Sequence, residues 1–234
     1  DWQSGLDQGS EAERSHPKPY TSGQNLIAQG VITVSESFWV SMGYLVLSAA
    51  ATAALATWTT PWVWLPWGLA SLCAPLYSYG KFHYGCELVL GLGFGPFAVM
   101  MGAAVGPGSE MARAFLAGIP FAIVFGYMAE TVDQYWDADV NVQKGLRNLG
   151  ALCWSRGWGL RWPLFLMALV TMGVHLALID AQVLSRWTFV ALPLLAFIVA
   201  LAPDFEKKKE PAIMAGLGLV LLYPLIIVLT EALT

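Results

Sequence analysis

Four carboxylates lie within one short polar stretch, Glu130-Thr-Val-Asp133-Gln-Tyr-Trp-Asp137-Ala-Asp139. If this stretch is helical, Asp133 and Asp137 stand four residues apart and project from one helix face. Carboxylates placed in this way repel each other unless a cation lies between them. Magnesium suits the position, because it binds through one or two carboxylates and completes its shell with waters and phosphate oxygens. The alternative is an acidic helix end that is solvated and has no ligand.

A second acidic pair, Asp1 and Asp7, occurs in the stretch Asp1-Trp-Gln-Ser-Gly-Leu-Asp7. Basic residues accompany the two pairs, namely Lys18, Lys81, Lys144 and Arg147. Two acidic pairs with flanking cations indicate a diphosphate held by metal ions. The basic residues also have an ordinary explanation, since membrane proteins concentrate Lys and Arg in the loops of one side.

Aromatic residues alternate with charges in the segment 77–87, Tyr-Ser-Tyr-Gly-Lys-Phe-His-Tyr-Gly-Cys-Glu. In an apolar cavity, the rings of Tyr79, Phe82 and Tyr84 could stabilise a carbocation by cation–π attraction. The alternative is a belt of aromatic side chains at the membrane interface.

The composition decides the class of protein that carries these groups. The 234 residues are 57 % hydrophobic and 12 % charged, and the mean hydropathy is +0.59, which excludes an ordinary soluble domain. The net charge of −4 argues against a nucleic-acid partner. Cys73, Cys86 and Cys153 have neither the even count of a disulfide framework nor the spacing of a zinc site.

Seven apolar runs are long enough to be membrane spans, because a hydrocarbon core of about 30 Å needs roughly 17 to 25 residues per helix. The sequence therefore predicts an all-α, polytopic bundle. The predicted spans are Phe38–Trp58, Trp62–Tyr79, Leu88–Val105, Met111–Ala129, Pro163–Ile179, Trp187–Ala202 and Pro211–Leu233.

The charges predict an orientation. If the spans alternate in direction, ten of the twelve basic residues and thirteen of the sixteen acidic residues lie on the side of the N-terminal segment. By the positive-inside rule this side is cytoplasmic. The chain is thus expected to be an integral membrane protein with its candidate site in the cytoplasmic loops.

Two weaker signals favour structural roles. The glycines of Gly91-Leu-Gly93-Phe-Gly95 lie inside an apolar run, which predicts close helix packing and not a phosphate loop. His175 is the histidine inside a span, and we expect it to be buried and hydrogen-bonded.

These motifs resemble those of the UbiA superfamily of intramembrane prenyltransferases. Asp1–Asp7 resembles the DxxSGxD end of the family's first motif, in the branch that prenylates 1,4-dihydroxy-2-naphthoate, and His16–Gly23 resembles the RPxxSG segment that follows it. Lys81–Glu87 and Gly93–Val99 resemble that branch's KYxGLGE and FGPLAV. Asp133–Asp137 takes the place of the second motif's DxxxD.

The resemblance implies a bundle of about nine helices, of which this chain would lack the first two, so that residues 1–234 form one N-terminally incomplete domain. Two differences from the family's motifs argue against an unaltered active site. Glu130 and Val132 stand where the family has Asn and Arg, and the GKxT segment that usually follows the second motif is missing.

The reaction that the resemblance implies is magnesium-dependent transfer of an isoprenyl group from a prenyl diphosphate to an aromatic acceptor. Asp1, Asp7, Asp133 and Asp137 would hold the metal, and Lys18, Lys81, Lys144 and Arg147 the diphosphate. Tyr79, Phe82 and Tyr84 would shelter the carbocation. The expected acceptor is a quinone precursor, with a chlorophyllide, a tocopherol precursor or a glycerol phosphate ether as alternatives.

Two other functions stay open at this point. The first is a non-catalytic relative that binds an isoprenoid or a quinone, or that serves as a structural subunit of a membrane complex. The second is a small transporter, which acids confined to one side and not placed in mid-span argue against.

Overall fold

Residues 31–106, 110–205, 207 and 209–233 are described by the computed structural model, and every regular element in them is helical. The predicted metal ligands Asp1 and Asp7 and the predicted diphosphate-binding Lys18 lie outside these residues. The all-α prediction is confirmed for the part of the chain that is described.

The first half of the chain forms four helical passes, two of which consist of several consecutive helical segments, and the two short elements η2 and α9. They are α2 (Val34–Trp58), η2 (Pro61–Val63), α3 (Trp64–Gly80), α4 (Cys86–Leu92), η3 (Gly93–Phe97), α5 (Ala98–Val105), α6 (Met111–Ala117), α7 (Ile119–Ala122), η4 (Ile123–Ala129), α8 (Glu130–Trp136) and α9 (Ala138–Gln143). The second half comprises α10 (Leu149–Ser155), α11 (Arg161–Asp180), η5 (Arg186–Ala191), α12 (Leu192–Phe205) and α13 (Lys209–Leu233).

Six helical stretches of the described chain are long and apolar enough to cross a membrane, where the sequence predicts seven. They are Val34–Trp58, Cys86–Val105, Met111–Trp136, Arg161–Asp180, Arg186–Phe205 and Met214–Leu233. The difference lies in the second predicted span, Trp62–Tyr79. There Pro61 begins a separate 3₁₀ turn, and the helix α3 that follows has 17 residues. Six such helices indicate an integral membrane protein.

Two helix boundaries differ from the prediction for local reasons. Helix α2 begins at Val34 and not at Phe38, because Thr33 and Glu36 form a capping box in which each side chain accepts the other's backbone N–H. The fourth span continues to Trp136, seven residues beyond its predicted end at Ala129. The continuation carries Glu130 and Asp133 on helix α8.

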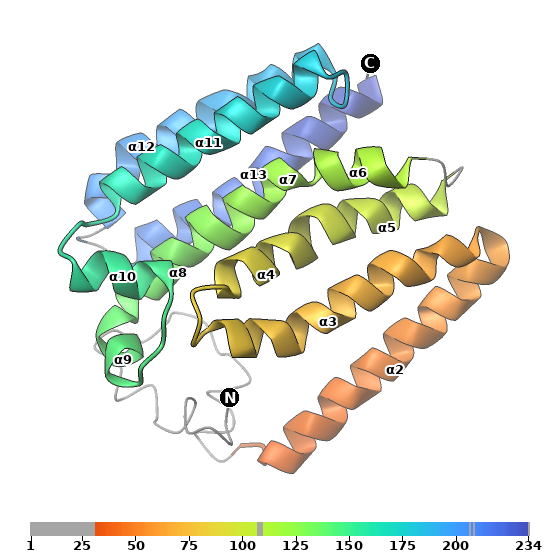
Figure 1. Ribbon diagram of the computed structural model, residues 1–234, viewed down its shortest axis with the longest axis horizontal. Helices are drawn as coiled ribbons and strands as arrows, with labels where there is room; N and C mark the ends of the chain where they lie inside the picture. The colour runs from red at the N-terminus through yellow and green to blue at the C-terminus, as the bar shows by residue number, and fades with distance from the viewer. Residues whose placement is uncertain (1–30, 107–109, 206, 208, 234) are drawn as a thin grey trace.

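The long helices lie roughly side by side in a bundle (Figure 1). In space α3 lies between α2 and α4, and the α7–α8 pass contacts both α11 and α13, each of which also packs on α12. The turn after α3, the short helices α9 and α10 and the start of α11 gather at one end of the bundle. We call residues 77–87 and 130–162 at this end the loop end.

Small residues let the central helices approach closely, as predicted for the glycine-rich run. A Cβ added to Gly91 would lie 2.5 Å from the Ala122 carbonyl oxygen, and one added to Gly95 would lie 2.6 Å from the Gly118 carbonyl oxygen. Gly93 is different, because its nearest neighbour is the Cys73 side chain at 3.4 Å. Gly91 and Gly95 thus serve helix packing.

His175 is fully buried and has a hydrogen-bond partner on each ring nitrogen, which confirms the prediction. Its Nδ1 lies 2.7 Å from the Tyr223 hydroxyl and its Nε2 lies 2.9 Å from the Thr188 hydroxyl. Thr188 donates its own proton to the Ser185 carbonyl at 2.7 Å. The Thr188 oxygen therefore accepts from Nε2–H, which leaves Nδ1 to accept from Tyr223.

Candidate functional site

Two loops of the loop end are joined by a pair of backbone hydrogen bonds. The Tyr84 N–H donates to the Arg147 carbonyl at 3.0 Å, and the Arg147 N–H donates to the Lys81 carbonyl at 2.6 Å. Segments more than sixty residues apart in sequence are thereby held together. Lys81 and Arg147, both predicted to bind a diphosphate, therefore sit on adjacent backbone.

Glu87 fixes the next element of the loop end. Its side chain is 1 % exposed, and its Oε1 accepts the backbone N–H of Leu149, the first residue of α10, at 2.6 Å. Asn148 caps the same helix by accepting the N–H of Ala151 at 2.7 Å. In the sequence, Glu87 is recognisable only as an acidic residue at the border of an apolar run. Nothing in the sequence indicates that its partner is helix α10.

A polar network connects α3, α4 and α8 beneath these loops. The Tyr77 hydroxyl donates to Glu130 Oε1 at 2.7 Å, and Gln134 Nε2 donates to the same oxygen at 3.0 Å. Gln134 Nε2 also lies 3.6 Å from Cys86 Sγ, which in turn donates to Glu87 Oε2 at 3.3 Å. Glu130, which in sequence is a departure from the family pattern, is therefore an acceptor at the centre of the site.

An acidic cavity of about 230 Å³ lies beside this network, between η4, α8 and α13. Glu130 and Asp133 line it together with apolar side chains and Gly216. Asp133 is half-buried. The cavity thus has two carboxylates on helix α8 and an apolar wall on helix α13.

A second, apolar cavity of about 210 Å³ adjoins the first. Both cavities are lined by Phe125 and Val220, so they lie next to each other along η4 and α13. The second is also lined by Phe94 and Phe121, and the rings of Phe94 and Phe125 stack with centroids 4.3 Å apart. Phe94 and Phe125 come from η3 and η4, two π-helical segments, an irregularity frequent at functional sites.

Asp137 is not placed as the regular-helix prediction requires. Helix α8 ends at Trp136, and Asp137 is its C-cap residue, with φ −101° and ψ 10°. It is 8 % exposed and is not among the residues that line the acidic cavity. Asp137 is therefore the residue at which the helix that carries Asp133 ends, and of the two only Asp133 lines this cavity.

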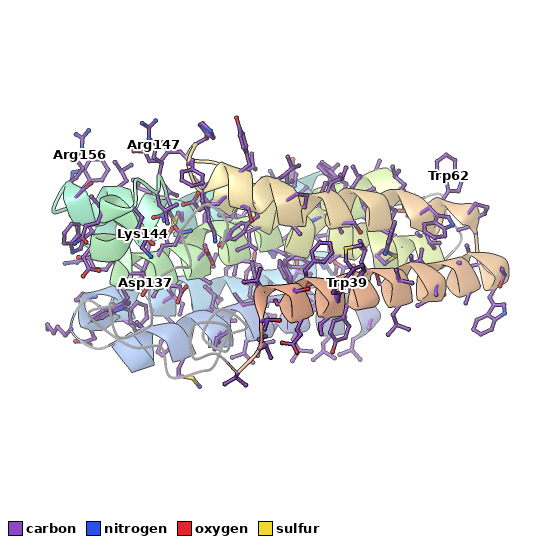
Figure 2. The ribbon with its side chains drawn as sticks, turned by 90° about the horizontal axis from the view of Figure 1, so that it is seen from below. Trp39, Trp62, Asp137, Lys144, Arg147 and Arg156 are labelled. Atoms are coloured by element: carbon purple, nitrogen blue, oxygen red, sulfur yellow. The ribbon has the colours of Figure 1, made fainter. Side chains whose placement is uncertain are left out.

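The predicted basic residues that the structure describes, Lys81, Lys144 and Arg147, lie at the loop end but differ in direction. Lys144 and Asp137 lie in the body of the bundle there, whereas Arg147 and Arg156 project outward (Figure 2). Lys81 places its Nζ 4.9 Å from the centre of the Tyr77 ring. Lys81 is thus directed toward Tyr77 of the polar network, and Lys144 lies within the same end of the bundle.

The predicted carbocation-sheltering rings are mostly turned outward. Tyr79 is 66 % and Tyr84 54 % exposed, and Tyr79 packs on the His83 ring with centroids 4.5 Å apart. Phe82 is half-buried. This exposure favours the interfacial-belt alternative for both tyrosines. The rings that line the apolar cavity are Phe94, Phe121 and Phe125, which the sequence did not single out because their spacing matches ordinary apolar helix. Tyr84 lines a separate pocket together with Arg147.

The donor set of the acidic cavity is of the type that magnesium prefers. Glu130 and Asp133 offer carboxylate oxygens, and magnesium commonly binds through one or two such groups with water completing the shell. Within the described ranges, no three His, Cys, Asp or Glu side chains form a cluster that could hold a metal. These two carboxylates therefore suit a metal ion whose other ligands come from a bound substrate and water. They do not form a site in which the protein supplies every ligand.

Comparison with known proteins yields no match: no protein-family model, no curated protein and no solved structure is significantly similar to this chain. The function must therefore be argued from the site itself.

Proposed function

We propose that this protein transfers an isoprenyl group from a prenyl diphosphate to an aromatic acceptor within the membrane. One observation carries the proposal: the acidic cavity at Glu130 and Asp133 adjoins the apolar, phenylalanine-lined cavity through Phe125 and Val220. A prenyl diphosphate has the same division, since a charged head is joined directly to a hydrocarbon tail.

The head of the substrate would occupy the acidic cavity. Magnesium, when bound, neutralises the charge that develops on the leaving diphosphate. Asp133 and Glu130 would hold the metal, and Asp1 and Asp7 of the N-terminal segment would add further carboxylates. Asp137 would join them if the C-terminal end of α8 moves. Lys81, Lys144 and Arg147, with Lys18, would bind diphosphate oxygens, because ammonium and guanidinium groups form charge-assisted hydrogen bonds with them.

The tail would occupy the apolar cavity. Phe94, Phe121 and Phe125 line it, and their ring faces would attract an allylic cation formed at the junction with the acidic cavity. Tyr79, Phe82 and Tyr84 would then border the entrance. The acceptor would be a quinone precursor, and the loop end would face the cytoplasm, as the resemblance and the distribution of basic residues imply.

One observation favours a second function, a non-catalytic protein that binds an isoprenoid or a quinone. Glu130 Oε1 already accepts hydrogen bonds from Tyr77 and Gln134, and Val132 is 2 % exposed within the hydrophobic core. In this arrangement Glu130 would stabilise the polar network and would not bind a metal, while the apolar cavity would still accept a hydrocarbon chain.

Release of pyrophosphate separates the two functions. The purified full-length protein would be incubated with geranylgeranyl diphosphate and a naphthoate or hydroxybenzoate acceptor, with and without magnesium. The transferase requires turnover that depends on magnesium and is lost in Asp133→Asn but kept in Asp204→Asn, an exposed acid of α12. Binding of the diphosphate with no turnover for any acceptor would favour the second function, and neither binding nor turnover would exclude both.

A further inference from the structure

An apolar groove of about 680 Å³ lies at the loop end, away from the two cavities described above. Helix α10 contributes Leu149 and Cys153, the following turn contributes Trp158, and the start of α11 contributes Trp162, Leu166 and Met167. The volume falls in the range of sites that hold a small organic ligand. None of its lining residues lines the acidic or the apolar cavity.

The groove exists because α10 is held away from α11. Gly150 packs directly on the backbone of Gln134 and Tyr135, and Glu87 accepts the first N–H of α10 at 2.6 Å, so α10 is fixed to α8 and α4. Gly157 and Gly159, with φ of +64° and +63°, then turn the chain into α11. The two helices diverge from this turn and leave the groove between them.

Tryptophans place the groove at a membrane interface. Trp154, Trp158 and Trp162 are 45 %, 55 % and 64 % exposed, and indole rings concentrate at the level of the lipid headgroups. They lie at an end of the bundle, where α10 and the start of α11 meet (Figure 1). Such exposed indole rings are what a groove that borders the lipid headgroups is expected to carry.

The exposed charges that flank the groove in sequence are basic, whereas the nearby Glu87 carboxylate, which accepts the Leu149 N–H, is buried. Residues 144–179 contain Lys144, Arg147, Arg156 and Arg161 and no acid. Arg156 directly precedes the groove residue Gly157, and Arg161 directly precedes the groove residue Trp162. Both arginines are exposed, and Arg156 projects outward from the bundle (Figure 2). Arginine forms two-pronged hydrogen bonds with phosphate, which a planar guanidinium fits well.

We propose that the α10–α11 groove is a binding site for an anionic phospholipid. One acyl chain lies against Leu149, Leu166 and Met167, and the phosphate is bound by Arg156 and Arg161. An anionic headgroup is selected over a zwitterionic one, because the segment offers no acid to pair with a choline or ethanolamine group. The site does not depend on the reaction proposed above.

Competitive lipid binding tests this site. Delipidated full-length protein in detergent is given equal amounts of phosphatidylglycerol and phosphatidylcholine with the same acyl chains, and retained lipid is counted by native mass spectrometry. With two arginines near the surface, the preference for phosphatidylglycerol is expected to be about thirtyfold. The double variant R156Q/R161Q is expected to lose most of it. The matched control is R113Q/R186Q, whose two arginines lie near the α5–α6 and α11–α12 connections.

A second variant tests the apolar part without changing charge. Leu166→Trp fills the groove from a side chain that is 60 % exposed, whereas Leu176→Trp adds the same bulk to α11 outside it. Loss of retained phosphatidylglycerol in Leu166→Trp alone supports the site. Equal retention of both lipids by the wild type, or an unchanged preference in R156Q/R161Q, overturns it. Displacement of the lipid by millimolar inorganic phosphate also overturns it, because the groove would then be an anion site without an acyl chain.

Discussion

The Tyr77 hydroxyl donates a 2.7 Å hydrogen bond to Glu130 Oε1 across 53 residues of sequence, and this bond joins α3 to the acidic cavity. Gln134, one turn further along α8, donates to the same oxygen at 3.0 Å. Glu130 therefore has a defined position at the cavity wall. The side chain that departs from the family pattern is also the one that the surrounding helices orient.

Removal of this hydroxyl should destabilise the protein. In Tyr77→Phe, a half-buried carboxylate loses one of its donors, and hydrogen bonds to charged groups contribute about 1.5 to 3 kcal/mol. We expect a lower melting temperature in detergent. Tyr44→Phe, on a side chain that is 71 % exposed on α2, serves as the control. Equal melting temperatures for the two variants would mean that the bond contributes nothing to stability.

The close approach of η3 to the α6–α7 junction should not tolerate a methyl group. An added Cβ at Gly95 would lie 2.6 Å from both the Ala122 nitrogen and the Gly118 oxygen, so Gly95→Ala must push two backbones apart. Overpacking of this kind costs about 1 to 3 kcal/mol. Gly102→Ala is the matched control on the adjoining helix α5, because nothing lies within 4 Å of its added Cβ. A melting temperature that is lower for Gly102→Ala than for Gly95→Ala would contradict this close packing.

Glu87 should stabilise the folded conformation of helix α10. Glu87→Ala removes the acceptor of the Leu149 N–H, and a helix end buried without its partner is destabilised. Hydrogen exchange measured by mass spectrometry should become faster in residues 149–155 while α11 keeps its protection. Glu36→Ala removes the carboxylate that accepts the Thr33 N–H at the start of α2 and should leave α10 unchanged. Unaltered exchange in α10 of the Glu87 variant would show that other contacts hold the helix.

The Cys153 thiol should react slowly near neutral pH. Burial raises its pKa to about 11, and the nearby Glu87 carboxylate acts in the same direction. Because the folded-state pKa is raised, the reactive thiolate is scarce at pH 8, about a hundredfold scarcer than for a thiol with the ordinary pKa of 9.0. In a Cys73→Ala, Cys86→Ala background, the alkylation rate should still rise as the pH goes from 8 to 10. A rate that levels off below pH 9 would contradict the raised pKa.

Much of the fold follows from local sequence patterns. The apolar runs gave the long helices to within a few residues, and Gly91, Gly95 and His175 have the packing and hydrogen bonding that was predicted for them. These features depend on composition and helical period, which are readable from one sequence. The count of seven spans is not confirmed in the described residues, because α3, which follows the 3₁₀ turn that begins at Pro61, has 17 residues and is not among the six long apolar stretches.

The site was predicted less completely, because its members meet only through tertiary contacts. Asp133, Lys81 and Lys144 were candidates by residue type. Tyr77 and Glu87 lie in the segment 77–87 that the sequence singled out, but no sequence signal identified Glu130 and α10 as their partners. The C-cap conformation of Asp137 was likewise invisible, since a DxxxD spacing fits an unbroken helix equally well. In the sequence, the cavity-lining phenylalanines cannot be distinguished from other apolar helix residues. Their role is visible only in the structure, where η3 and η4 lie side by side.

The central claim is that the acidic and apolar cavities bind one prenyl diphosphate. Its most direct test compares the affinities of geranylgeranyl diphosphate and pyrophosphate, with and without magnesium, in wild type, Val220→Trp and the control Leu221→Trp. Val220 lines both cavities, whereas Leu221 is 67 % exposed. We predict magnesium-dependent binding of both ligands, with geranylgeranyl diphosphate weakened about tenfold or more in Val220→Trp alone. Affinities that do not depend on magnesium, or an affinity for geranylgeranyl diphosphate that is equal in the two tryptophan variants, would contradict the claim.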